Sequence, residues 1–176
     1  MTYTIRYLDE DQLLEDRPAD VGYAAEKVSV KTKSGEVVQI GGMVRGVTQI
    51  LISLPNLGEP FVKMAQAIRN EVTKPEGVRL WVILNRFGPE IAAFQEDDVI
   101  KLAEDFEGEF GGMYGVKIAD GLLEGALTAG LFVISKDGTL FYRDVPREIP
   151  GAFNHDRFLK EANKAVNVYN GQGCHG

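Results

Sequence analysis

The sequence contains very little cysteine. Cys174 is the single cysteine among 176 residues, and it lies two residues before the end of the chain. One cysteine excludes an internal disulfide, and it also excludes a redox cycle in which two cysteines of the same chain oxidise each other. The scarcity is typical of a protein from a reducing compartment, and we expect a cytoplasmic protein.

Long apolar runs and clusters of basic residues are also absent. No segment approaches the about 18 consecutive apolar residues of a membrane span. The N-terminal sequence MTYTIRYLDEDQ has no basic region followed by an apolar one, so it does not resemble a signal peptide. The net charge of −7 argues against nucleic acid or an anionic membrane as the main partner. We therefore expect a soluble protein without either partner, whose acidity serves solubility.

Sequence motifs for cofactors and metals are missing as well. The glycine-rich stretches GGM (41–43) and EFGGMYG (109–115) lack both a following Lys-Ser/Thr pair and the G-x-G-x-x-G spacing. His155 is expected to be a solvated residue near the start of the last helix. Cys174 and His175 offer two ligands, which are too few for a closed zinc site without a second chain. We predict no cofactor and no metal site.

What the sequence does contain is the patterning of one α/β domain over residues 1–170. Residues 27–33 and 36–40 alternate apolar and polar side chains around a Ser-Gly turn, which predicts an N-terminal β-hairpin. Residues 47–54 and 79–85 are almost continuously apolar, as in central strands covered on both faces. A proline-opened amphipathic helix between these strands predicts a parallel crossover.

A second hairpin and a final helix complete the predicted domain. Residues 127–135 and 139–145 form the hairpin around a Lys-Asp-Gly turn, and an amphipathic helix begins at Asn154. The order of these elements indicates a thioredoxin-like sandwich, in which helices flank a central mixed β-sheet.

Four segments have weaker patterns. Residues 97–105 fit either a strand or a short helix, and the glycine-rich residues 107–115 predict a loop with one helical turn. The acidic run at residues 9–16 predicts a solvated face or an unpaired arm. Residues 171–176 predict a flexible, glycine-rich tail that carries Cys174.

One long segment resembles a known family. Residues 115–149, GVKIADGLLEGALTAGLFVISKDGTLFYRDVPREI, resemble the loop, strand and hairpin of thiol peroxidases. The resemblance is in the order of the elements and in residue identity, notably in GV, DG and the VPREI ending. Thiol peroxidases are atypical two-cysteine members of the peroxiredoxin superfamily. The similarity covers about residues 28–158 by simple pattern matching. This resemblance implies a thioredoxin-like fold, a homodimer and a relation to thiol and peroxide redox metabolism.

The resemblance also locates the family's nucleophile. Its signature is a proline followed by Thr or Ser and then a peroxidatic cysteine in the first turn of a helix, where N–H groups and an arginine stabilise the thiolate that attacks peroxide. In the stretch SLPNLGEPFV, Pro55 and Pro60 fall on the family's prolines. Glu59 falls on the threonine, and Val62 falls on the cysteine.

Two further positions of the family fall at Gln95 and Gly130. Gln95 stands for the resolving cysteine, and Gly130 stands for the active-site arginine, with an offset of one residue allowed. The resemblance therefore implies a thiol peroxidase-like protein with a degenerate site, a pseudoenzyme that is retained for binding. We expect Val62 to face inward as part of the core, and Glu59 to disfavour a thiolate beside it.

Cys174 leaves an alternative function open. A mobile terminal thiol is able to carry sulfur or electrons to a thioredoxin-like or sulfur-transfer partner, which would make Cys174 the catalytic residue of a thiol-dependent oxidoreductase or carrier. The other interpretations are one ligand of a metal shared with His175, and a terminal thiol without function.

Overall fold

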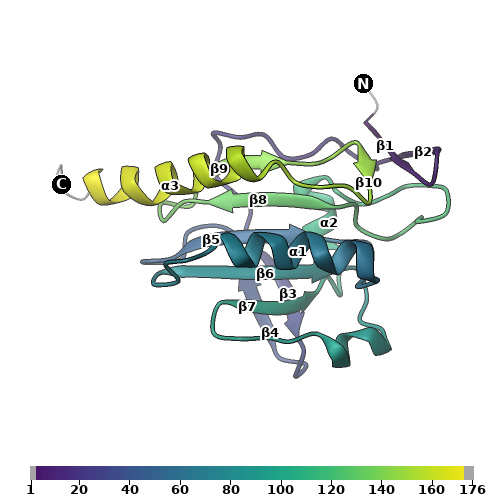
Figure 1. The fold of residues 1–176 in the computed structure, drawn as a ribbon, viewed down its shortest axis with the longest axis horizontal. Coiled ribbons are helices and arrows are strands. Elements are labelled where there is room, and N and C mark those ends of the chain that lie inside the picture. The colour runs from purple at the N-terminus through teal and green to yellow at the C-terminus, as the bar shows by residue number, and fades with distance from the viewer. Residues whose placement is uncertain (1–2, 173–176) are drawn as a thin grey trace.

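A mixed sheet of seven strands forms the centre of the fold (Figure 1). The computed structural model describes residues 3–172. In spatial order the strands are β4 (Val37–Ile40), β3 (Val28–Thr32), β7 (Ile100–Glu104), β6 (Val78–Leu84), β5 (Thr48–Ser53), β8 (Gly130–Ile134) and β9 (Leu140–Asp144). The pairs β5–β6 and β6–β7 are parallel, and the other neighbours are antiparallel. Both predicted hairpins are confirmed, and they form the two edges of the sheet.

Strand β5 is buried along its whole length. Its backbone pairs with β6 on one side and with β8 on the other, so that Ile52 lies opposite Val82 and Leu131. Its isoleucines and leucine suit a strand that is covered on both faces. Because β5 is held from both sides, it fixes the point at which the chain leaves the sheet.

Helices cover both faces of the sheet. They are α1 (Glu59–Glu71), α2 (Glu109–Tyr114) and α3 (His155–Gln172). Phe61 of α1 and Phe158 of α3 belong to the hydrophobic core on one face. Phe110 and Tyr114 of α2 belong to the core on the other face, where their rings stack with centroids 4.5 Å apart. Figure 1 shows α1 in front of β5 and β6. The predicted α/β sandwich is confirmed.

Helix α1 has the predicted position and the predicted buried face. Pro60 stands in its first turn, where the missing N–H group has no helical partner to lose. Phe61, Met64 and Ile68 recur at helical spacing, and all three are buried. Because β5 and β6 are parallel neighbours, the predicted strand–helix–strand crossover is confirmed.

Helix α3 begins after Asn154, as its sequence predicts. The Asn154 side-chain oxygen accepts the N–H of Arg157 at 3.0 Å, which caps the helix. Phe158 is buried against the sheet. The helix continues to Gln172, two residues into the segment that was predicted to be a tail. No helix within residues 3–172 is both long enough and apolar enough to cross a membrane.

The two ambiguous segments become regular elements. Residues 97–105 contain strand β7, and residues 107–115 contain the six-residue helix α2 instead of a loop with one helical turn. Gly108 and Gly115 flank this helix, and both have positive φ. The prediction failed because two of the glycines that argued against a helix lie outside it: Gly115 ends the helix in the left-handed conformation typical of C-termini, and Gly108 provides a positive φ just before it.

The N-terminal segment forms a small second sheet that was not predicted. Strands β1 (Thr4–Tyr7) and β2 (Glu10–Leu13) pair as a hairpin, and β10 (Glu148–Ile149) pairs in parallel with β1. The acidic side chains are exposed, but the backbone is not an unpaired arm. Only Ile5 and Gln12 of this hairpin are buried, so its sequence shows no clear alternation.

Asp105 holds the start of α2. One carboxylate oxygen accepts the N–H of Phe110 at 2.9 Å, and the other accepts the N–H of Gly111 at 2.8 Å. Burial raises the pKa of Asp105, and these two hydrogen bonds oppose that rise.

We expect Asp105→Ala to lower the free energy of unfolding by about 1–3 kcal/mol, because two N–H groups lose their acceptor. Urea unfolding followed by circular dichroism measures the change. Glu107→Ala removes an exposed carboxylate from the same loop and serves as the control, with an expected effect below about 0.5 kcal/mol. Equal losses in the two variants would contradict this role of Asp105.

Candidate functional site

The first turn of α1 follows the buried end of β5 after a short loop. Pro55 lies partly buried in that loop, and the Asn56 side chain accepts the N–H of Gly58 at 2.8 Å. Gly58 is the residue that precedes the helix. Its carbonyl accepts the N–H of Phe61 at 3.0 Å and the N–H of Val62 at 2.9 Å. Since proline has no N–H, the first turn offers few donors to an anion.

Glu59 is paired rather than isolated. Its carboxylate lies 2.8 Å from the Lys63 ammonium, one turn further along α1, and both side chains are mostly exposed. The hydrogen bond from Lys63, followed by its charge, lowers the pKa of Glu59. Lys63 offsets part of the Glu59 charge, and the effect of Glu59 on a thiolate at position 62 stays a prediction. Glu59 is a first-turn acid, as favoured by the helix dipole.

Val62 lies in the first turn, but it is not the residue that fills the core. Its side chain is partly exposed and packs at the edge of the hydrophobic core, whereas the neighbouring Phe61 is 3% exposed. The Phe61 ring stacks with Tyr7 of β1, with centroids 6.3 Å apart. The expectation that Val62 faces inward as part of the core is confirmed in part, because its side chain packs against the core without being buried.

Gln95 lies beside the same helix. It follows the short 3-10 helix η1 (Pro89–Ala93), and its side chain lines a cavity of about 280 Å³ together with Gln66 and Asn70 of α1. Val62 and Gln66 are four residues apart, so they share one face of α1. The structure therefore brings Gln95 close to the α1 face on which Val62 lies, about one turn further along.

An ion pair that the sequence did not predict borders this cavity. Arg69 of α1 contacts Asp97 at 3.1 Å, and both residues also line a second cavity, of about 450 Å³, at the end of α1. The N–H of Ile100 lowers the pKa of Asp97, and Arg69 adds to this effect. The two partners are 28 residues apart in sequence, so no local spacing could have indicated the pair.

Gly130 is the first residue of β8, and it is not oriented toward α1. It pairs with Ser53, and a Cβ placed on it would lie 3.0 Å from Ser53 Oγ and 3.1 Å from a ring carbon of Phe132. Phe132 belongs to the core on the α2 face. Ala129, by contrast, belongs to the core that contains Phe61 of α1. Because side chains alternate along a strand, the position that faces α1 is 129, within the one-residue offset that the prediction allowed.

The remaining predicted residues lie elsewhere. Pro60 is exposed in the first turn of α1. Cys174 lies outside the described residues. Within residues 3–172, no three His, Cys, Asp or Glu side chains come together in a group that could hold a metal ion. A third cavity, of about 250 Å³, lies between α2 and residues 19–26. None of the three cavities is lined by Pro55, Glu59, Pro60, Val62 or Gly130.

Solved structures share this architecture over nearly the whole chain. A peroxiredoxin-like protein from Aquifex aeolicus aligns with a TM-score of 0.83 at 24% identity, over 94% of this chain and 99% of that one. The thiol peroxidase from Chromobacterium violaceum aligns with a TM-score of 0.81 at 14% identity, over 92% and 96% of the two chains. The fold is therefore that of the peroxiredoxins, a thioredoxin-like fold, as predicted.

Sequence relatives give the family. The thiol peroxidase of Campylobacter jejuni is 32% identical over 170 residues, which cover 92% of this chain and 93% of the relative. The thiol peroxidase of Aquifex aeolicus is 29% identical over 150 residues, which cover 83% and 88% of the two chains. No family model matches the sequence. At this identity and coverage the chain belongs to the thiol peroxidase family.

Replacing the two glycines Gly130 and Gly112 tests the packing around the start of β8. Gly130→Ala is expected to lower the free energy of unfolding by about 1–3 kcal/mol, because the new methyl group crowds Ser53 and Phe132. Gly112→Ala, in the middle of α2, meets open space and is expected to be neutral or to stabilise by up to about 1 kcal/mol. Chemical unfolding of the wild-type protein and the two variants measures both changes in the free energy of unfolding. An alanine tolerated equally at both positions would contradict the tight packing at 130.

The first turn of α1 is expected to be a poor place for a thiolate. In a Cys174→Ser background, Val62→Cys should have an apparent thiol pKa at or above about 8.5, the value of a free cysteine. The physical reason is twofold. The N–H groups of Phe61 and Val62 already donate to the Gly58 carbonyl, and Ala129, which faces α1, supplies no positive charge to stabilise a thiolate. The rate of alkylation measured against pH gives this pKa.

Ser34→Cys in the same background places a thiol in an exposed turn and provides the reference. A pKa at position 62 clearly below that reference would show that the turn still activates thiols.

Proposed function

We propose that this chain keeps the thiol peroxidase fold for binding and has lost peroxide chemistry. The observation that carries the proposal is the first turn of α1, where Val62 stands at the place that the resemblance gives to the peroxidatic cysteine. Residues 1–173 contain no cysteine that could replace it. Without a thiolate, the O–O bond of a peroxide meets no nucleophile at this corner of the fold.

Three features of the surroundings support the proposal. The N–H groups of Phe61 and Val62 donate to a backbone carbonyl, so they are not free to hold an anion. The position that faces α1 at the start of β8 is Ala129, which carries no charge. Gln95, at the place given to the resolving cysteine, has an amide that forms no disulfide.

The proposal includes the assembly and the location of the protein. We infer a homodimer from the family resemblance, and a cytoplasmic location from the scarcity of cysteine. The alternative, a thiol carrier or oxidoreductase that uses Cys174, draws no support from residues 3–172, because Cys174 lies outside them. The assay below therefore includes removal of this thiol.

Peroxide turnover tests the proposal. Hydrogen peroxide and an alkyl hydroperoxide are supplied with dithiothreitol, and separately with thioredoxin and its reductase, and peroxide consumption is followed. The wild-type protein and the Cys174→Ser variant are both expected to consume peroxide no faster than the reductant does without protein, because neither has a thiol in the first turn of α1.

A Campylobacter jejuni thiol peroxidase, assayed in parallel, shows that the conditions support family activity. Turnover by the wild-type protein well above the rate of Cys174→Ser would contradict the proposal and would favour the Cys174 alternative. Equal, clearly measurable turnover by both proteins would also contradict it, because the activity would then come from a group other than a thiol.

A further inference from the structure

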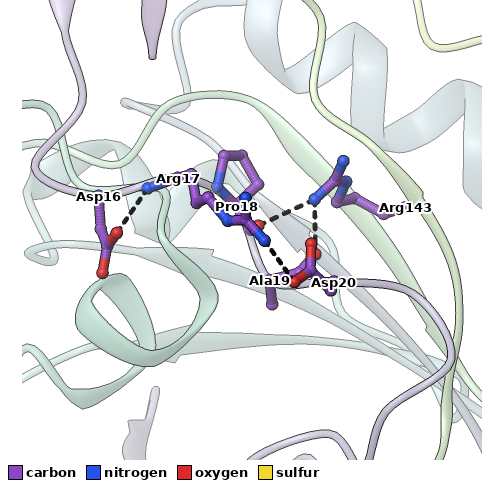
Figure 2. A network of polar contacts seen from close by, with 6 residues as sticks. All are labelled: Asp16, Arg17, Pro18, Ala19, Asp20 and Arg143. Carbon is purple, nitrogen blue, oxygen red and sulfur yellow. Dashed lines mark hydrogen bonds and ion pairs between the residues drawn. The ribbon is translucent and has the colours of Figure 1, made fainter. Parts of the chain in front are cut away.

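The segment of residues 17–25 is fixed along the edge of the large sheet. Arg143 of β9 donates from Nη1 to the carbonyl of Pro18 at 2.9 Å and to the carbonyl of Ala19 at 2.7 Å. Figure 2 shows the Arg143 side chain reaching these two carbonyls. The Ala19 N–H donates to the carbonyl of Tyr114 in α2 at 3.0 Å. We refer to residues 17–25 as the strap.

The second half of the strap is held by backbone hydrogen bonds. The N–H of Gly22 donates to the carbonyl of Leu140, and the N–H of Leu140 donates to the carbonyl of Tyr23, at 2.8 and 2.9 Å. The N–H of Ala25 donates to the carbonyl of Gly138 at 2.8 Å. The backbone of the strap is therefore constrained before any partner arrives, which reduces the entropy lost on binding.

This constrained segment presents apolar side chains to solvent. In the strap, the Tyr23 side chain is 71% exposed and the Val21 side chain is 48% exposed. Met113 of α2 is 56% exposed. Tyr23 and Met113 line the same cavity of about 250 Å³, which is bounded further by Tyr114 and Leu140. Since about 150 Å³ suffices for a benzene ring, this cavity has room for one large apolar side chain.

The rim of the cavity is acidic. Asp20 and Glu26 line it, and both are exposed. Arg17 pairs with Asp20 at 2.6 Å, whereas the Glu26 carboxylate has no ion-pair partner among the described residues. No basic residue lines the cavity. The whole chain is also negative, with a net charge of −7. A cationic group beside an apolar one is therefore the complementary chemistry.

We propose that the strap cavity binds an extended segment of another protein that inserts one large apolar side chain between Tyr23 and Met113. Lysine or arginine beside that side chain contacts Glu26. Tyrosine and methionine are side chains that protein interfaces favour, and a rigid aromatic residue beside a pocket is a typical anchor.

This inference deepens the proposal that the fold is retained for binding, and it rests on that proposal. Tyr114 and Leu140 belong to the core on the α2 face, whereas α1 covers the opposite face. A failure of the peroxide assay and a failure of the binding experiment are therefore distinguishable, because they concern different faces of the sheet.

The probe is a library of random short peptides displayed on phage and selected against the full chain. Enriched peptides are then synthesised with a fluorophore, and their affinities are measured by anisotropy at low and high salt. The test variants are Tyr23→Ala, Met113→Ala and Glu26→Gln. Leu122→Ala is the matched control, because Leu122 is a 64% exposed apolar residue that does not line the cavity. Thermal unfolding verifies that all variants are folded.

The expected peptides combine one large apolar residue with neighbouring lysine or arginine. Their affinity is expected to fall about tenfold or more with Tyr23→Ala and Met113→Ala, by a smaller factor with Glu26→Gln and at high salt, and to stay unchanged with Leu122→Ala. The proposal is overturned if no peptide is enriched, if the enriched peptides are acidic, or if Tyr23→Ala leaves their affinity unchanged. It is also overturned if sedimentation shows self-association that Tyr23→Ala abolishes, because the occupant is then a second copy of the chain.

Discussion

The burial of strand β5 between β6 and β8 is the constraint on which the remaining structure depends. Every residue of β5 is buried, so the strand has one register that places its apolar side chains in both core layers. The end of β5 then determines where α1 begins, and the buried side chain of Phe61 holds the first turn against the sheet and against Tyr7. None of these contacts involves a thiol or a charged group. The frame of the family is therefore stable whether or not its reactive residues are present.

If peroxide chemistry is absent, as we propose, the same contacts explain how the first turn of α1 keeps its shape without it. The Gly58 carbonyl accepts the N–H groups of Phe61 and Val62, and Lys63 pairs with Glu59 on the surface. An anion bound here would have to compete with these internal partners for hydrogen bonds. The apolar Val62 side chain needs no hydrogen bond, so it avoids that competition. Binding surfaces, by contrast, need only a rigid backbone and exposed side chains, and the strap along β9 has both. Selection for binding can therefore act on one face of the sheet while the opposite face remains a packing surface.

The sequence predicts those elements whose patterns are local. The apolar run of β5, the spacing of Phe61 and Ile68 in α1, and the cap at Asn154 each depend on neighbours within a few residues. The β1–β2 hairpin was not predicted, because its strands are short and because β1 pairs with β10, which is distant in sequence. Of the candidate site, the first turn of α1 was located correctly. The direction of Val62, the partner of Glu59 and the orientation of Gly130 all depend on tertiary contacts, so they required the structure.

The central claim is that no group on the α1 face reacts rapidly with peroxide. The most direct measurement is a single-turnover competition, which needs no recycling reductant. The reduced protein and a haem peroxidase compete for limiting hydrogen peroxide, and the absorbance change of the haem reports how much peroxide it receives. We expect an equimolar or tenfold excess of the protein to leave that absorbance change unaltered, with the same result for Cys174→Ser. A reduction of the haem signal that grows with the concentration of the protein would contradict the account.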